Sequence, residues 1–189
     1  MITILIGKSA TGKDTILREL RDEYGYEPII STTSRPMRGN EKDHVDYIFV
    51  SSEIFRVMIQ IGCFIEYRSY NTLVNGKPDT WYYGVQTFEP DDNRNYVVIL
   101  DVEGTKSFID HFERDNLRII YIDADDDIRK SRAEKRGSFD ETEWQRRFID
   151  DNIKFSCDVC DSLCDSYINN NGIKTIREIA KEIHEFVNN

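Results

Sequence analysis

A glycine-rich segment directly after a short apolar run constrains this chain more than any other feature. Residues 2–6 (ITILI) are apolar and mostly β-branched, which is typical of a buried strand. Residues 7–13 (GKSATGK) follow with the G-x-x-x-x-G-K spacing of a phosphate-binding loop. Residues 15–24 have helical spacing, and Gly25 marks the expected helix end. Strand, loop and helix in this order predict a cradle of backbone N–H groups for an anion.

Lys13 decides between a phosphate site and a simple connecting turn. A lysine in the first turn of a helix is unfavourable for the helix dipole unless an anion is bound there. A glycine-rich turn that only joined a strand to a helix would have no use for it. The sequence therefore predicts that Lys13 contacts the β- and γ-phosphates of a nucleotide.

Asp14 departs from the usual form of this loop. A Ser or Thr normally follows the lysine, because its hydroxyl ligates magnesium, whereas here Thr15 comes one residue later. The Asp14 carboxylate suits the positive end of the helix, and it could hold magnesium directly or through water. It could equally weaken nucleotide binding by adding negative charge near the phosphates. The spacing leaves both alternatives open.

The rest of the chain predicts an α/β fold with a parallel sheet flanked by helices. Two apolar runs, residues 96–100 and 118–122, end at Asp101 and Asp123, and each precedes a helix-like segment. Such alternation puts ligands at the carboxyl ends of the strands. The final helix is predicted from an apolar stripe of period 3.6. Its members are Ile173, Ile176, Ile179, Ile183 and Phe186.

Two segments break the alternation and predict the domain organisation. Residues 32–86 contain a polar loop, a short helix near residues 53–61 stopped by Gly62, and aromatic strand-like pieces, as expected of an inserted lobe. Residues 134–148 are irregular and rich in arginine, which favours a mobile flap. We expect a core of residues 1–31, 87–131 and 149–189, a lobe at 32–86 and a lid at 132–148.

Composition limits the possible partners. The formal net charge is -10, from 25 Lys and Arg against 35 Asp and Glu, so nucleic acid is not expected as a partner. A small anionic ligand would need a local basic cluster. No apolar run is long enough to span a membrane and no signal peptide is recognised, so we expect a cytoplasmic protein without a membrane partner.

The cysteines are expected to be reduced in that compartment. Cys157, Cys160 and Cys164 have the spacing of neighbours on one helix face. A zinc site would need a fourth ligand in a recognisable motif, and none is evident, so thiols are the preferred interpretation.

Further motifs resemble those of the guanylate kinase family, enzymes that phosphorylate GMP with ATP. The resemblance rests on the phosphate loop read together with residues 31–51 (STTSRPMRGNEKDHVDYIFVS), and it covers nearly the whole chain. The other matching pieces are CFIEY, WYYG, VILDVEG, RAEKRG, RRF and SYINNN. It implies a P-loop sheet with an inserted GMP-binding lobe and a small lid, and magnesium as the cofactor of ATP.

The resemblance also implies a role for each matching residue. The catalytic residues it implies are Lys13, Arg132, Arg136 and Arg147. The ATP-binding residues are Gly7, Ser9, Ala10, Thr11, Gly12, Lys13, Asp14, Thr15 and Asn170. The GMP-binding residues are Ser31, Arg35, Arg38, Tyr47, Glu66, Tyr83, Asp101 and Glu103. The metal-binding candidates are Asp14 and Asp101.

These roles suit the residue types. The planar guanidinium of an arginine grips a phosphate with two donors. A carboxylate such as Glu66 accepts from both N1–H and the exocyclic amine of guanine, a donor pair that adenine does not present. Three departures border the base site: Val85 replaces a hydroxyl residue, Glu103 replaces an aspartate, and the loop of residues 67–80 is longer than usual.

Two alternatives to a guanylate kinase remain. One is a kinase for another or a modified nucleoside monophosphate, which Val85 and the long loop leave open. The other is a non-catalytic module of the same family that binds phosphorylated peptides; the retained Lys13, Arg136 and Arg147 argue against it. The sequence leaves open whether the protein is a monomer or a homo-oligomer.

Overall fold

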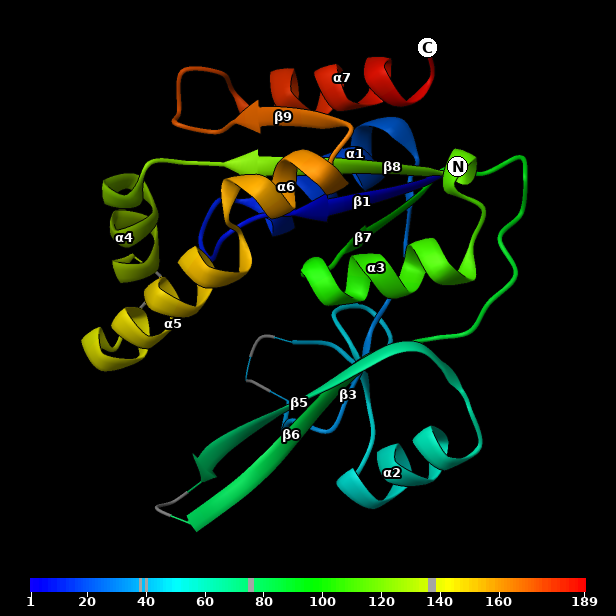
Figure 1. Cartoon of the computed structure of the whole chain (residues 1–189), viewed down its shortest axis with the longest axis vertical. Coiled ribbons are helices and arrows are strands. Elements are labelled where there is room, and N and C mark those ends of the chain that lie inside the picture. Colours follow the sequence, from blue (N-terminus) through cyan, green and yellow to red (C-terminus); the bar gives the residue numbers. More distant parts are fainter. Residues whose placement is uncertain (38, 40, 75–76, 136–138) are drawn as a thin grey trace.

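The computed structural model describes the chain apart from residues 38, 40, 75–76 and 136–138 (Figure 1). Strands and helices alternate around a central sheet, and a second sheet lies below it in Figure 1. In chain order the elements are β1 (Ile2–Ile6), α1 (Lys13–Tyr24), β2 (Glu27–Pro28), β3 (Thr32–Thr33), β4 (Ile48–Phe49), α2 (Ser52–Gln60), β5 (Phe64–Val74), β6 (Lys77–Gln86), β7 (Tyr96–Ile99), α3 (Val102–His111), η1 (Arg114–Asn116), β8 (Leu117–Asp123), α4 (Asp126–Glu134), α5 (Glu141–Lys154), α6 (Cys157–Leu163), β9 (Ser166–Asn169) and α7 (Ile176–Val187).

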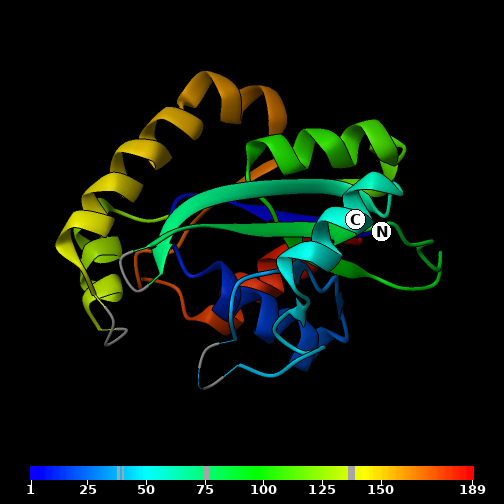
Figure 2. The ribbon, with the colours of Figure 1, turned by 90° about the horizontal axis from the view of Figure 1, so that it is seen from below.

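The central sheet has the strand order β2-β7-β1-β8-β9, and its neighbouring strands are parallel. Alternate residues of β1 enter cores on opposite faces: Ile4 packs in the cluster of Phe108 of α3, and Leu5 in the cluster of Ile16 and Ile183 of α1 and α7. Figure 2 shows α3 on one side of the sheet and α1 and α7 on the other. Each such burial stabilises the fold by about 1.5–3 kcal/mol. The predicted fold class is confirmed.

The second sheet has the order β4-β3-β6-β5 and is formed by residues from the predicted lobe. Phe55 of α2 is fully buried there, stacked on Phe64 and Tyr82 with ring centroids 4.5 and 5.4 Å apart. The prediction of a loop at residues 67–80 is wrong. Strands β5 and β6 pair antiparallel as far as Val74 and Lys77, so most of this segment is a long hairpin whose backbone polar groups are paired.

Two helices differ from their sequence-based predictions. Ile173 is 93% exposed and lies outside α7, because the helix begins after Thr175, which caps it together with Glu178. The irregular segment expected at residues 134–148 is helical from Glu141 onward, since Asp140 caps α5 by accepting from the N–H of Glu143 at 2.7 Å. The predicted division into core, lobe and lid stays a prediction.

The cysteine-bearing segment forms α6 and packs against the central sheet. Cys160 is buried in the same core as Phe155 of α5. Burial raises the pKa of the Cys164 thiol to about 12, so this thiol is protonated at neutral pH. Within the described part of the chain, none of the helices has the length and apolar character needed to cross a bilayer.

Candidate functional site

The phosphate-type loop, residues 7–13, leaves β1 at the carboxyl edge of the central sheet. A Cβ on Gly7, whose φ is 142°, would lie 2.2 Å from the carbonyl oxygen of Ile122, so only glycine lets the chain pass β8 here. Ala10 is held in a left-handed conformation (φ 63°), which costs about 1 kcal/mol or more. The loop therefore stores backbone strain at the point where α1 begins.

Lys13 lies inside the curve of this loop. Its Nζ donates to the carbonyl oxygens of Gly7 (2.7 Å) and Lys8 (2.8 Å), and it lies 3.4 Å from Oγ1 of Thr11. These contacts keep the ammonium group at the N-terminal end of α1. The predicted phosphate-binding lysine thus stands beside a helix terminus that favours anions.

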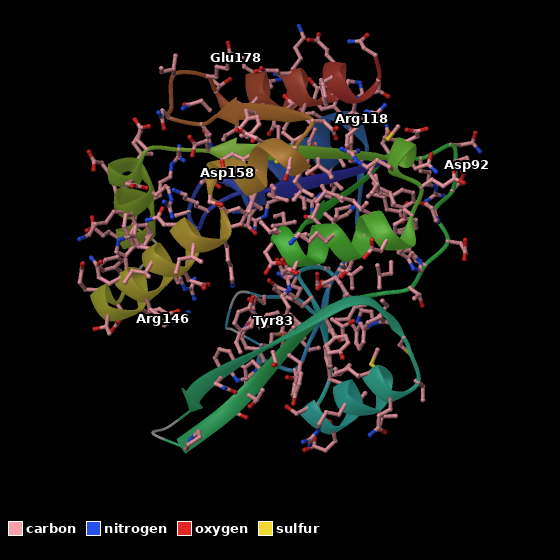
Figure 3. The ribbon with its side chains drawn as sticks, in the orientation of Figure 1. Tyr83, Asp92, Arg118, Arg146, Asp158 and Glu178 are labelled. Carbon is pink, nitrogen blue, oxygen red and sulfur yellow. The ribbon has the colours of Figure 1, made fainter. Side chains whose placement is uncertain are left out.

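A cavity of about 520 Å³ opens beside the loop, within the size range of small-molecule sites. The central sheet and loop line one side, the hairpin of β5 and β6 another, and α5 a third; Figure 3 labels Tyr83 on β6 and Arg146 on α5, and both line the cavity. Of the predicted site residues, those that line it are Gly7, Ser9, Lys13, Ser31, Tyr47, Glu66, Tyr83, Asp101 and Arg147. The cavity joins the phosphate loop to the predicted base-reading glutamate.

Glu66, Arg68 and Asp101 lie together at the end of the cavity formed by β5 and the start of α3. Glu66 is 5% exposed, and burial raises the pKa of its carboxyl although Arg68 opposes this effect. The Arg68 guanidinium lies between the two acids: Nη2 is 3.1 Å from Oε2 of Glu66, and Nη1 contacts Oδ2 of Asp101. Sequence reasoning missed Arg68, because an arginine in a strand has no pattern that separates it from a solvated one.

Asp101 is fully engaged in this structure. Besides its contact with Arg68, its Oδ1 accepts from the backbone N–H of Gly104 at 3.0 Å and caps α3. Glu103, the neighbouring candidate, has a 73% exposed side chain and pairs with Lys106 on the solvent side of α3. The structure therefore separates these two candidates, and only Asp101 faces the cavity.

Residues of both charges on α5 line the cavity opposite the hairpin: the acids Glu143, Asp150 and Asp151 and the bases Arg146, Arg147 and Lys154. Glu143 holds Arg146 through two hydrogen bonds of 2.8 and 2.9 Å and accepts from Nε of Arg147 at 2.6 Å. The two guanidinium groups, with Arg146 the larger cause, lower the pKa of Glu143 to about 2. Glu143 therefore stays ionised and fixes a pair of cavity-lining cations, of which only Arg147 was predicted.

A buried ion pair connects the phosphate loop to α4 and α5. Asp151 Oδ2 accepts from the N–H of Ser9 and from Nη2 of Arg129, both at 2.7 Å. Arg129 Nε donates to the carbonyl oxygen of Ser9 at 2.8 Å, so both backbone groups of Ser9 are held. The Arg129 side chain is fully buried, 5.6 Å from the ring centre of Trp144 and 5.9 Å from that of Phe148.

Several predicted residues lie outside the cavity. Arg132 and Asn170 are bound to the loop and to each other: Arg132 donates to the carbonyl oxygens of Thr11 (3.3 Å) and Asn170 (2.8 Å), and the Asn170 amide donates to that of Thr11 (2.7 Å). Asn170 is 2% exposed, and its side chain stabilises the loop through this hydrogen bond. Neither residue lines the cavity; both hold the backbone of the loop at the carbonyl oxygen of Thr11.

Arg35 is also away from the cavity surface. It is 4% exposed, donates to both carboxylate oxygens of Glu41 at 2.6 and 3.0 Å, and lies 5.4 Å from the ring centre of the cavity-lining Tyr47. Val85, expected beside the base, is 1% exposed in the hydrophobic core and does not line the cavity. Arg38 and Arg136 lie outside the described residues.

The predicted metal candidates, Asp14 and Asp101, lie in different surroundings. Among the residues that the structure describes, no group of three or more His, Cys, Asp or Glu side chains is placed to hold an ion. Asp14 and Thr15 are exposed in the first turn of α1, and Asp101 is occupied by Arg68 and Gly104. Asp14 fits a water-mediated contact to an ion carried by nucleotide phosphates, whereas Asp101 in this conformation does not fit a direct one.

Comparison with known proteins gives one consistent result. Residues 1–188 match the model of the family described as guanylate kinase. The chain is 35% identical to the guanylate kinase of Enterococcus faecalis over 112 residues, 58% of this chain and 53% of that protein. It is 27% identical to that of Porphyromonas gingivalis over 98% of this chain and 97% of the relative. The crystal structure of guanylate kinase from Anaplasma phagocytophilum has the same fold, with a TM-score of 0.67 at 23% identity over this whole chain and 84% of the other.

Proposed function

The chain belongs to the guanylate kinase family, and we propose that it transfers the γ-phosphoryl group of ATP to GMP or dGMP. The products are ADP and GDP or dGDP. The observation that carries this proposal is a cavity that has the phosphate loop and Lys13 at one end and buried Glu66 at the other. A donor and an acceptor nucleotide would meet between these ends, beside the arginines of α5.

The reaction needs positioning and positive charge more than it needs a general base. The second pKa of a phosphate monoester is about 6, so the acceptor already has an anionic oxygen at neutral pH. Lys13, Arg146 and Arg147 would balance the charge of the two phosphate chains, and their fixed geometry would hold the reacting oxygens in line. Magnesium bound with ATP would neutralise phosphate oxygens, and Asp14 would contact it through water.

Turnover with a panel of nucleoside monophosphates tests the proposal. ADP release should be measured with ATP and each of GMP, dGMP, AMP, CMP and UMP. Rapid turnover with GMP and dGMP alone supports it. Equal use of the other acceptors would favour a broader nucleoside monophosphate kinase. No turnover with any acceptor would favour a binding module.

Replacing Lys13 by alanine should remove most turnover while the fold stays intact. One preorganised donor at a developing charge is worth about 3 kcal/mol, or about a hundredfold in kcat. The matched control is Lys181→Ala on α7, whose 64% exposed side chain points to solvent. Kinetics and circular dichroism of both variants check this result. Lys13→Ala activity within a few-fold of the unmodified protein would contradict the kinase proposal.

Replacing Asp14 by serine should leave the enzyme active and change its magnesium dependence. The serine hydroxyl would take the place of a water-mediated carboxylate contact, which alters the affinity for the ion. Initial rates over a magnesium titration check this, with Asp22→Ala on the exposed face of the same helix as control. If Asp14→Ala changes neither the rate nor the magnesium dependence, Asp14 serves only as a charge at the start of α1.

A further inference from the structure

Strand β5 brings an arginine into the part of the cavity where the base would bind. Arg68 lies two residues after Glu66, lines the cavity, and keeps a 22% exposed side chain there. A guanidinium has five N–H donors and no acceptor. Its contacts with Glu66 and Asp101 engage Nη2 and Nη1 only. Arg68 therefore has donors beyond those two contacts.

Of the buried polar side-chain atoms without hydrogen-bond partners in the described chain, Oγ1 of Thr3 and the hydroxyl of Tyr26 lie elsewhere, and the others lie around this position. Within the described chain these others are Oε2 of Glu66, Nε of Arg68 and Nε1 of Trp81, and all three residues line the cavity. Although Nη2 of Arg68 lies 3.1 Å from Oε2 of Glu66, the contact is an ion pair without hydrogen-bond alignment. Buried polar groups are rarely left unpaired, so a cluster of one acceptor and two donors points to a polar ligand.

Guanine matches an acceptor beside a donor. Its O6 accepts hydrogen bonds, and the adjacent N1–H and exocyclic amine donate them. With Glu66 accepting from N1–H and the amine, the neighbouring O6 would face a donor on the same strand. Arginine is the side chain that pairs most often with the O6 side of guanine in nucleic-acid recognition. Adenine has an amine at this position, which a guanidinium would repel.

We propose that Arg68 is a specificity-determining residue that donates to O6 of the purine. The proposal rests on the proposed function, because it assumes that the base lies against Glu66. Arg68 would then donate to O6 while Glu66 accepts from N1–H and the amine, so that the two side chains bind one edge of the base. The competing structural role is that of a counter-ion which only permits two carboxylates to lie close together.

Dissociation constants distinguish recognition of O6 by Arg68 from a role of Arg68 as a counter-ion. Dissociation constants for GMP, IMP and 6-thio-GMP should be measured by calorimetry with the unmodified protein, Arg68→Ala and Arg68→Lys. GMP and IMP share O6, whereas 6-thio-GMP replaces it with a weakly accepting sulfur. Arg56→Ala is the matched control, since Arg56 lies on α2 with a 56% exposed side chain.

Arg68→Ala should weaken GMP and IMP binding by the same factor, about tenfold or more, and should change 6-thio-GMP binding little. Arg68→Lys should restore part of the difference. Equal weakening of all three ligands would overturn the proposal in favour of a counter-ion. Tighter GMP binding by Arg68→Ala would overturn it in favour of an arginine that obstructs Glu66.

The same measurement distinguishes this proposal from the proposed function. GMP binding with the expected Arg68 dependence but no phosphoryl transfer would refute the kinase activity and support the role of Arg68. If the protein phosphorylates GMP but each Arg68 variant changes GMP and 6-thio-GMP binding by the same factor, the kinase activity is supported and the role of Arg68 is refuted. Failure of the unmodified protein to bind GMP at all would refute both.

Discussion

Replacing Glu66 by alanine should abolish most of the discrimination between GMP and AMP. A site built to hydrogen-bond its substrate rejects an analogue that leaves buried groups unpaired by about 10⁴-fold. Glu66 is 5% exposed and borders the cavity, so an adenine base would leave its carboxylate unpaired. The ratio of kcat/KM for GMP to that for AMP should therefore be large in the unmodified protein and fall steeply in Glu66→Ala.

The KM for ATP should stay the same in this variant, because the phosphate loop lies at the other end of the cavity. Glu53→Ala is the matched control, because Glu53 has a 75% exposed side chain on α2, the helix that packs against β5 through Phe55 and Phe64. Val85→Ser should not improve GMP binding, since residue 85 lies in the core and not on the cavity. Efficient use of AMP by the unmodified protein would refute the base-reading role of Glu66.

Replacing Arg129 by methionine should cost about 3–5 kcal/mol of unfolding free energy. The substitution removes one partner of a buried ion pair and leaves the Asp151 carboxylate without its charge partner. Methionine fills part of the space between Trp144 and Phe148, so the loss comes mainly from the unpaired charge and not from a cavity. Urea denaturation followed by circular dichroism gives the unfolding free energy.

The control for this variant is Arg177→Met, whose 74% exposed side chain pairs with Glu23 on the surface and should change stability by less than about 1 kcal/mol. Adding Asp151→Leu to Arg129→Met should recover only part of the loss, because the N–H of Ser9 would then lack its acceptor. A cost below about 1 kcal/mol for Arg129→Met would show that the pair does not hold the loop.

Local sequence patterns were sufficient for the central fold and the phosphate loop. The run at residues 2–6, the glycine spacing and the amphipathic helix after it all act over short distances, and the structure has the corresponding β1, loop and α1. The starts of α7 and α5 were predicted wrongly, although local sequence signals mark both of them. Thr175-x-x-Glu178 and Asp140-x-x-Glu143 are capping patterns, and they mark the beginnings of α7 and α5.

The cavity walls were harder to predict because they depend on pairing between distant residues. Arg129 stands in a charged segment, DDDIRKSR, that is typical of a solvated helix, yet its side chain is fully buried. Its partner Asp151 lies 22 residues later, and no periodicity connects the two. Arg68 on β5 likewise contacts Asp101, which follows β7 of the other sheet at the start of α3, and no local pattern connects the two residues.

The bond between Ser9 and Asp151 links residues separated by 142 positions in the chain, and that separation has a consequence for folding. Contacts of long sequence separation form late, because a large loop must close before they contribute stability. During synthesis, β1, β7 and β8 can pair while α5 is still missing. The glycine-rich segment then lacks the carboxylate that fixes Ser9. We therefore expect a nascent chain ending before residue 151 to form sheet structure while Ser9 still lacks the contact with Asp151.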